Sequence, residues 1–245
     1  MGMPVTVEVI DKSAGQGLLD EVFAYFGYVD RKFSTYSDQS EISLINRGGL
    51  EPANASTDMQ SIFALAEQTR LETNGYFDIL HDGTYDPSGV VKGWAILKAA
   101  EILDRRGAAN YYVEAGGDIQ MTGHNSDGDD WRVGIRNPFD PEQIVKVLSL
   151  TDCGVATSGT YVRGSHIYNP MGANDPLDEI VSLTVIGPNI CDADRFATAA
   201  FAMGRAGIFF IEDLPGFEAY MINREQRATF TTGFERYLLH DAIHR

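Results

Sequence analysis

The sequence predicts an α+β fold in which helices pack against mostly antiparallel sheets, and three observations support this prediction. Some segments repeat apolar residues at helical spacing, whereas others are short and rich in Val and Ile. The two kinds of segment do not alternate regularly, which argues against a doubly wound parallel sheet. The chain also lacks a G-x-G-x-x-G or Walker motif, so neither a Rossmann fold nor a P-loop fold is indicated.

Helices are expected where apolar residues recur at intervals of three and four. Leu18, Val22, Phe26 and Val29 show this spacing, so the stretch that contains them should bury one helical face. The expected helices span residues 18–33, 40–46, 57–72, 89–106 and 193–203. Their expected N-terminal capping residues are Ser40 for the second, Thr57 or Asp58 for the third, and Ser88 or Asp86 for the fourth.

Strands are expected where short runs alternate apolar and polar residues. Two of these runs flank Gly116-Gly117, whose glycines suit a sharp turn, so the runs should pair as a hairpin. The expected strands span residues 4–10, 111–114, 119–122, 131–136, 145–150, 180–186 and 217–223. The chain has no internal repeat and no low-complexity segment, and we expect one domain over residues 1–245.

The negative charge of the chain makes some classes of binding partner less favourable than others. The formal net charge is −16 at pH 7, which argues against a nucleic-acid partner because a phosphate backbone needs a basic surface. A small anionic ligand remains compatible with this charge, provided that local cations and backbone amides offset the repulsion.

The two cysteines and the N-terminal residues carry no targeting or metal signal. Cys153 and Cys191 do not form a C-x-x-C pair, and we expect two buried thiols rather than a disulfide. No basic segment, apolar core or run of 18 apolar residues is present, so we expect no membrane span. As written, the chain is expected in the cytoplasm; it would be exported or lipid-anchored if an N-terminal signal had been removed.

Four short motifs follow one another along the chain and carry the chemistry. Each combines glycine and small residues with a few charged or hydroxyl side chains, a composition that suits backbone passing close to a phosphorylated ligand and a hard metal ion. The motifs are residues 86–93, residues 115–118, residues 156–159 with 166–170 just after them, and residues 193–199.

Asp194 and Thr198 are candidate metal ligands. They lie four residues apart in an expected helix, so their side chains share one face. A carboxylate and a hydroxyl oxygen suit Mg²⁺, which keeps several waters and takes few protein ligands. In the alternative interpretation, which the spacing by itself favours, Asp194 caps the helix and Thr198 bonds back to a backbone carbonyl.

Lys92 and Gly89 are candidate ligand-binding residues at the start of the helix over 89–106. A helix N-terminus attracts phosphate, a lysine one turn further adds a positive charge, and the Gly89 carbonyl could reach a metal. The alternative for Lys92 is a solvated lysine on a surface helix. Asp118 could accept a hydrogen bond from a ligand ring or ribose, or could be a turn residue bonded to its own backbone.

Two further segments have both a functional and a structural interpretation. Ser158 and Gly159 belong to a stretch whose hydroxyls and successive amides could bind an anion, and the alternative is a simple loop. His166 could act as a general base or orient a phosphate, and the alternative is a hydrogen-bonded structural histidine. Neither a G-x-S-x-G elbow nor an H-E-x-x-H motif occurs, so acyl hydrolases and zinc proteases are not indicated.

In this order the four motifs resemble the ApbE family, whose members are FAD:protein FMN transferases. The resemblance extends from Met1-Gly2 to about Gly204, and residues 193–199 are its most specific part. The other matching residues are 33–36, 40–43 with Asn46, Phe77-Asp78, 86–93, 116–118, Ser158-Gly159 and His166-Ile167.

The resemblance implies an ApbE-like fold with an FAD cleft between two lobes. It implies that Asp194, Thr198 and the Gly89 carbonyl hold Mg²⁺, and that Lys92, Asp194 and His166 are catalytic. The residues that would bind FAD are Met1, Tyr36, Tyr76, Phe77, Asp78, Asp86, Lys92, Asp118, Ser158, Gly159, His166 and Ile167.

The implied reaction is the transfer of FMN from FAD to an acceptor protein. A Thr or Ser hydroxyl of the acceptor would attack the FMN-side phosphorus, and AMP would leave, so that positioning and charge neutralisation supply most of the catalysis. Two alternatives stay open: an FAD pyrophosphatase that releases FMN and AMP, and a flavin-binding protein without turnover.

The chain departs from the family pattern at several positions. Phe77-Asp78 lies only eight residues before Asp86, where the family has a much longer segment, so we expect a helix and loop near the site to be missing. Leu97 and Asn169 stand where the family has acids, and Val91 replaces a small residue. These departures leave the implied metal ligands in place, so FAD binding is indicated more strongly than transfer.

Overall fold

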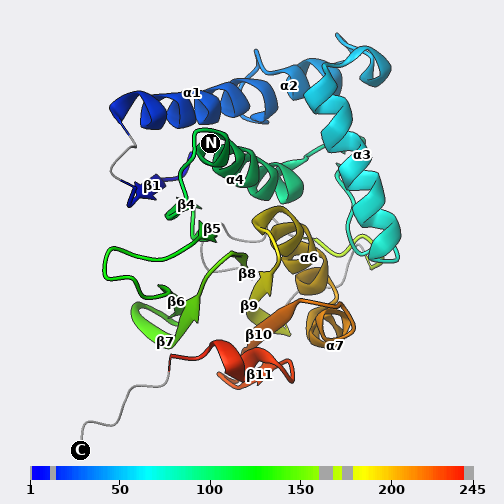
Figure 1. Ribbon diagram of the computed structural model, residues 1–245. Coiled ribbons are helices and arrows are strands. Elements are labelled where there is room, and N and C mark those ends of the chain that lie inside the picture. Colours follow the sequence, from blue (N-terminus) through cyan, green and yellow to red (C-terminus); the bar gives the residue numbers. More distant parts are fainter. Residues whose placement is uncertain (1, 12–14, 160–167, 173–178, 240–245) are drawn as a thin grey trace, which may run out of the picture.

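The computed structural model describes residues 2–11, 15–159, 168–172 and 179–239 (Figure 1). Within them, seven strands form one sheet in the order β1-β4-β5-β8-β9-β10-β11, and each neighbouring pair is antiparallel. These strands are β1 (Val5–Val9), β4 (Tyr111–Ala115), β5 (Asp118–Thr122), β8 (Cys153–Gly159), β9 (Ile180–Gly187), β10 (Glu218–Asn223) and β11 (Ala228–Phe230). The α+β fold with antiparallel sheet is confirmed.

Two smaller antiparallel pairs accompany the sheet. A long ribbon consists of β6 (Trp131–Asn137) and β7 (Asp140–Leu150), and a short hairpin consists of β2 (Leu80–His81) and β3 (Thr84–Tyr85). The helices are α1 (Gln16–Phe33), α2 (Glu41–Asn46), α3 (Thr57–Glu72), α4 (Ser88–Arg105), α6 (Ile190–Ala202) and α7 (Gly207–Glu212). Short 3₁₀ turns span Pro52–Asn54, Gly204–Ala206 and Phe234–Tyr237.

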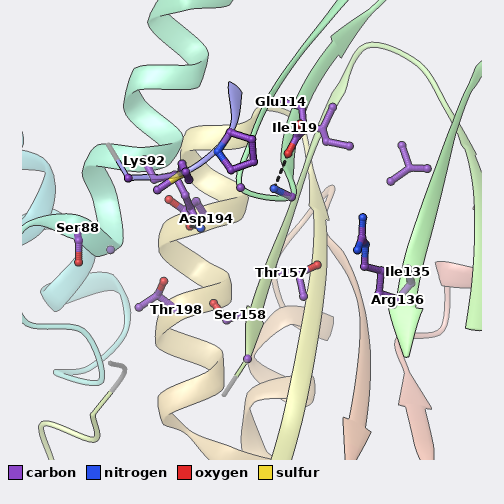
Figure 2. A pocket seen from close by; sticks show the side chains of 18 of the residues that line it. Ser88, Lys92, Glu114, Ile119, Ile135, Arg136, Thr157, Ser158, Asp194 and Thr198 are labelled. Carbon is purple, nitrogen blue, oxygen red and sulfur yellow. Dashed lines mark hydrogen bonds and ion pairs between the residues drawn. The ribbon is translucent and has the colours of Figure 1, made fainter. Parts of the chain in front are cut away.

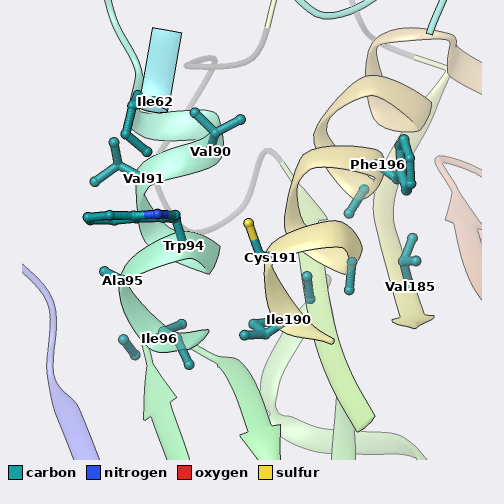
Figure 3. Close-up of a cluster of buried hydrophobic side chains, with 14 of the residues drawn as sticks. Ile62, Val90, Val91, Trp94, Ala95, Ile96, Val185, Ile190, Cys191 and Phe196 are labelled. Carbon is teal, nitrogen blue, oxygen red and sulfur yellow. The ribbon is translucent and has the colours of Figure 1, made fainter. Parts of the chain in front are cut away.

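Successive side chains of a strand point to opposite faces of the sheet, and here both faces contribute to a hydrophobic core. In β9, Val185 joins the core beneath the helices, whereas Ile186 joins a second core shared with the β6–β7 ribbon. Helices α4 and α6 pack side by side on the first face, where Figure 3 shows Cys191 between them. On its other side, α4 packs against α1 through Trp94, whose ring meets Phe33 edge-on at 5.7 Å.

Most of the expected elements are present, and several boundaries needed correction. Ser40 caps α2 as expected, but Ser56 rather than Thr57 or Asp58 caps α3. Asn189 caps α6, and the first residue of this helix, Ile190, lies three residues before the expected start. Pro87 occupies the N-cap position of α4 without a side-chain cap, while the Asp86 carboxylate accepts a hydrogen bond from the backbone N–H of Ser88.

The loop interpretation of residues 156–159 is wrong, because this stretch ends the central strand β8. These residues pair with β9, whereas the pairing of β8 with β5 stops at Val155, and the Thr157 N–H donates to the Asp118 carboxylate instead. The strand is rich in small residues because α6 crosses it closely: a Cβ at Gly154 would lie 2.1 Å from the Ile190 nitrogen. The sequence analysis also missed β2, β3, β11 and α7.

Two further expectations concern the thiols and the membrane. Cys153 and Cys191 are buried free thiols, as expected. Among the described residues, no helix combines the length and the apolar character that crossing a bilayer requires.

Candidate active site

A cavity of about 900 Å³ opens where the first turns of α4, the middle of α6, the end of β8 and the β6–β7 ribbon approach one another. Figure 2 shows Ser88 and Lys92 on α4 at one side of the view, Asp194 and Thr198 on α6 beside them, and Arg136 on β6 at the other side. The helices and the ribbon thus form opposite walls. The volume lies within the range of about 300–1,000 Å³ that is typical of small-molecule sites.

A buried ionic cluster forms the helical wall of the cavity. The Lys92 Nζ lies 2.6 Å from the Asp118 Oδ2 and 3.3 Å from the Asp194 Oδ1. The second oxygen of each carboxylate accepts a backbone hydrogen bond: Asp118 Oδ1 from the Thr157 N–H at 3.0 Å, and Asp194 Oδ2 from the Gly93 N–H at 2.8 Å. The two aspartates are 1% and 2% exposed, so their charges are held by protein groups.

Burial and ion pairing act in opposite directions on the pKa of Asp194. Burial, with a smaller effect of the neighbouring Asp118, raises the pKa of its carboxyl to about 7, although Lys92 and the Gly93 N–H act to lower this pKa. Since a carboxylate this deeply buried is costly without a counter-charge, the site is built to hold positive charge beside Asp194.

Gly93 allows the two helices to bring these residues together. A Cβ at this position would lie 2.7 Å from the Asp194 Cβ and 2.8 Å from the Ile190 carbonyl oxygen. The absence of a side chain lets α4 approach α6 so closely that the Gly93 amide reaches a carboxylate 101 positions away in the sequence. Lys92, directly before Gly93, is thereby directed at the same carboxylate.

The corner around Asp194 has oxygen groups of the kind that Mg²⁺ prefers. Thr198 lies one turn further along α6 and lines the cavity with Asp194. The first turn of α4 lies against it, since a Cβ at Gly89 would lie 3.3 Å from the Thr198 Cγ2. One carboxylate, one hydroxyl and one carbonyl fit Mg²⁺. The described part of the chain has no cluster of three or more His, Cys, Asp or Glu residues that could hold another kind of metal.

These contacts exclude the structural alternatives for three residues. Asp194 lies inside α6, which Asn189 caps, so it is not a capping residue. Lys92 is mostly buried and ion-paired rather than solvated. Asp118 accepts a hydrogen bond from the Thr157 N–H and forms an ion pair with Lys92, so it is not a self-bonded turn residue, and it is not among the residues that line the cavity.

The other predicted residues divide into three groups. The structure places most of them along the cavity: Tyr76, Phe77, Asp78, Asp86, Gly89, Lys92, Ser158, Gly159, Asp194 and Thr198. Tyr36 is not among the lining residues, and its side chain is 99% exposed in the turn after α1. Met1, His166 and Ile167 lie outside the described residues.

Arg136 and Tyr168 are among the residues of the cavity wall that sequence reasoning missed. Arg136 lines the wall formed by the ribbon, and the alternation of residues 131–136 could have indicated it, because that alternation places Arg132, Gly134 and Arg136 on one exposed face. Tyr168 donates a hydrogen bond to the Asp78 carbonyl oxygen at 2.6 Å and stacks on His81. Burial raises the pKa of Tyr168 to about 12, which keeps this donor protonated.

Comparisons with known proteins find relatives that share one name. An FAD:protein FMN transferase of Vibrio cholerae is 30% identical over 167 residues, which are 64% of this chain and 50% of the relative. The FAD:protein FMN transferase of Escherichia coli K12 is 28% identical over 199 residues, which are 77% of this chain and 55% of the relative. The chain therefore matches about half the length of these curated relatives.

Solved structures show the same fold. The flavin transferase ApbE from Vibrio cholerae superposes with a TM-score of 0.85 at 25% identity, covering 97% of this chain and 96% of that one. The apbe protein of Thermotoga maritima has a TM-score of 0.84 at 21% identity, over 98% and 97% of the two chains. The family model described as "ApbE family" matches residues 1–83 and 81–221, and this chain belongs to the ApbE family.

Proposed function

We propose that this protein is an FAD:protein FMN transferase, which moves FMN from FAD to a Thr or Ser hydroxyl of an acceptor protein and releases AMP. One observation carries the proposal: four groups from distant segments converge on one corner of a large cavity. They are the Lys92 ammonium, the Asp194 carboxylate, the Thr198 hydroxyl and the first turn of α4 at Gly89. The names of the matched relatives support the same activity.

The helical wall of the cavity suits a diphosphate with a metal ion. Asp194, Thr198 and the Gly89 carbonyl would hold Mg²⁺, whose charge offsets the negative charge that phosphoryl transfer concentrates on the phosphate oxygens. Lys92 would place a second positive charge near the same oxygens. The two helices hold these groups in advance, so little reorganisation is needed during the reaction.

The remaining walls suit the two ring systems of FAD. Tyr76, Phe77 and Tyr168 lie beside the start of α4, and the hydroxyl of Tyr168 is already bonded to the backbone. On the ribbon side, Trp131 and Tyr112 form an edge-to-face pair with ring centroids 5.2 Å apart. Flat aromatic walls at both sides of a phosphate-binding corner are what a molecule with two rings joined by a diphosphate requires.

The acceptor hydroxyl must lose a proton as it attacks phosphorus. His166 is our candidate to place or deprotonate this hydroxyl, on the basis of the motif that it shares with the family. Lys92 and Asp194 would position the phosphate that is attacked. AMP would leave from the opposite side of phosphorus, as in other phosphoryl transfers.

The proposal is tested by incubating the protein with FAD and Mg²⁺, using a lysate of the source organism as the pool of acceptor proteins. A transferase leaves a fluorescent flavin covalently bound to protein on a denaturing gel, with FMN on a Thr or Ser peptide by mass spectrometry and AMP in solution. AMP with only free FMN identifies a pyrophosphatase instead. FAD binding without AMP identifies a flavin-binding protein.

A matched pair of variants ties the reaction to the site. Asp194→Asn keeps the shape of the side chain but removes its charge, so AMP release and adduct formation should fall by about two orders of magnitude or more. Asp213→Asn changes an exposed residue at the end of α7 and should leave both unchanged. Normal turnover by Asp194→Asn would show that the metal ligands are misassigned.

A further inference from the structure

Two buried carboxylates share one lysine at the candidate site. The side chains of Asp118 and Asp194 are 1% and 3% exposed, and that of Lys92 is 14% exposed. When both carboxylates are ionised, two aspartates and one lysine leave the cluster with one net negative charge. Since a buried carboxylate without a counter-charge strongly destabilises the fold, Lys92 replaces solvent as the partner of both.

The ion pair of Lys92 with Asp118 is shorter than its ion pair with Asp194. The Lys92 Nζ lies 2.6 Å from the Asp118 Oδ2, and the other oxygen of Asp118 is held by the Thr157 amide. The distance from the Lys92 Nζ to the Asp194 Oδ1 is longer, 3.3 Å. Asp194 also lies on the cavity wall, whereas Asp118 is not among the residues that line the cavity. Asp118 therefore holds Lys92 in place. The contact between Lys92 and Asp194 is the one that can break, which leaves the Asp194 carboxylate available on the cavity side.

We propose that Lys92 is an internal counter-cation that competes with the divalent metal for Asp194, and that Asp118 holds Lys92 aside when the metal binds. This inference rests on the proposed function, because it takes Asp194 as a metal ligand. Lys92 and a metal ion beside the same carboxylate repel each other, so each weakens the other's hold on it. Asp118 is then a positioning residue that acts on metal affinity through Lys92.

The charge of the cluster gives each variant a direction. Lys92→Met leaves two negative charges, Asp118→Asn leaves none, and the double variant restores the single negative charge of the wild type. With Mn²⁺ alone as the probe, Lys92→Met should bind about tenfold more tightly than wild type or better, and Asp118→Asn about tenfold more weakly. The double variant should return to within about threefold of wild type.

Binding is measured without FAD, by titration calorimetry and by electron paramagnetic resonance of free Mn²⁺. Lys98→Met is the matched control: it lies on the same helix, pairs with Glu101 on the outer face at 2.9 Å, and changes the total charge equally. Its Mn²⁺ affinity should equal that of wild type. Circular dichroism checks that each variant is folded. If Lys92→Met does not fold, the comparison of the other two variants still tests the inference, because the double variant must bind Mn²⁺ about tenfold more tightly than Asp118→Asn.

Unchanged or weaker Mn²⁺ binding by folded Lys92→Met overturns the inference, as does an affinity of Asp118→Asn equal to wild type. A merely structural role for Asp118 would not be reversed by removing Lys92. Failure of the proposed function has a different signature, because wild-type protein would then form no covalent flavin while the order of Mn²⁺ affinities could still hold. Covalent flavin with Mg²⁺ but no change of affinity would overturn only the competition.

Discussion

Arg136 brings a positive charge to the wall of the cavity that lies opposite the helices (Figure 2). Its side chain is exposed, and no ion pair to another described residue engages it. A guanidinium can bind a phosphate through two parallel hydrogen bonds. In a chain with a net charge of −16, such a group on a cavity wall is suited to an anionic ligand.

We therefore predict that Arg136→Gln weakens FAD binding about tenfold, because one charge-assisted contact to a phosphate is lost. Riboflavin, which has no phosphate, should bind both proteins equally. Fluorescence titration of each flavin measures the two dissociation constants. Arg31→Gln, on the exposed face near the end of α1, is the control and should bind FAD normally. Equal FAD affinities for Arg136→Gln and wild type would remove Arg136 from the site.

The two thiols offer a test of burial. Burial raises the pKa of Cys153 and of Cys191 to about 12, above the ordinary thiol value, so the folded protein favours the neutral form. This contribution to stability is present below the pKa of the unfolded thiols and is lost as the pH rises towards about 12.

We predict that neither thiol of the folded protein reacts quickly with Ellman's reagent at about pH 8, because both are protonated and covered. The free energy of unfolding should fall as the pH rises from about 9 towards 12. Both cysteines should react at once in guanidinium chloride, which is the control. Equal labelling rates of folded and unfolded protein would contradict the burial of these side chains.

At the scale of elements, the crossing of α4 and α6 decides whether the site exists. The crossing is close because Gly93 has no side chain, and it brings the end of one motif to the start of another. The same principle holds where α6 crosses β8 at Gly154. Small residues at these positions therefore shape the site, although neither Gly93 nor Gly154 lines the cavity.

Gly93→Ala tests this crossing. The new methyl group would overlap the Asp194 Cβ and backbone of α6, so the helices must separate, which should cost about 1–3 kcal/mol of the free energy of unfolding and weaken Mn²⁺ binding. Gly27→Ala on α1 is the matched control, since its new Cβ would meet only the end of the Arg31 side chain, at 3.4 Å, and it should raise stability by about 0.5–1 kcal/mol. Chemical denaturation measures both. Equal stability of Gly93→Ala and wild type would contradict the close packing.

At the scale of the whole molecule, the net charge of −16 opposes the approach of an anionic ligand. Lys92, Arg132 and Arg136 lie on the walls of the cavity, where they act at short range. Long-range repulsion and short-range attraction respond differently to salt, because salt screens charges that are more than about 10 Å apart at 0.1 M ionic strength.

We predict that the association rate of FAD rises about two- to fivefold between low ionic strength and about 0.3 M salt, as the repulsion is screened. Stopped-flow fluorescence measures this rate. Riboflavin is uncharged, so its association rate should not change with salt. A rate for FAD that falls as salt is added would mean that the local cations dominate the approach of the ligand.

Local patterns predicted much of this fold. Apolar spacing located α1 and α4 to within two residues at each end, and alternation located β4, β5 and β6. Both patterns reflect one-sided burial, which depends on a residue's near neighbours. The strand β8 was not predicted because it consists largely of small residues. Its strand conformation comes from pairing with β5 and β9. The hairpin β2–β3 turns at Asp82-Gly83, and both residues have positive φ. An Asp-Gly pair is a typical hairpin turn, so this hairpin could have been predicted from the sequence.

By itself, the sequence determined which residue types were available for chemistry: a lysine early in a helix, an aspartate and a threonine four apart, and the ordered motifs of one family. Only the tertiary structure decided what these residues contact. It turned Asp118 towards Lys92, left Tyr36 in solvent, and placed Arg136 on the cavity wall. The physical reason is that these outcomes depend on packing between segments far apart in the chain, and local periodicity carries no information about such contacts.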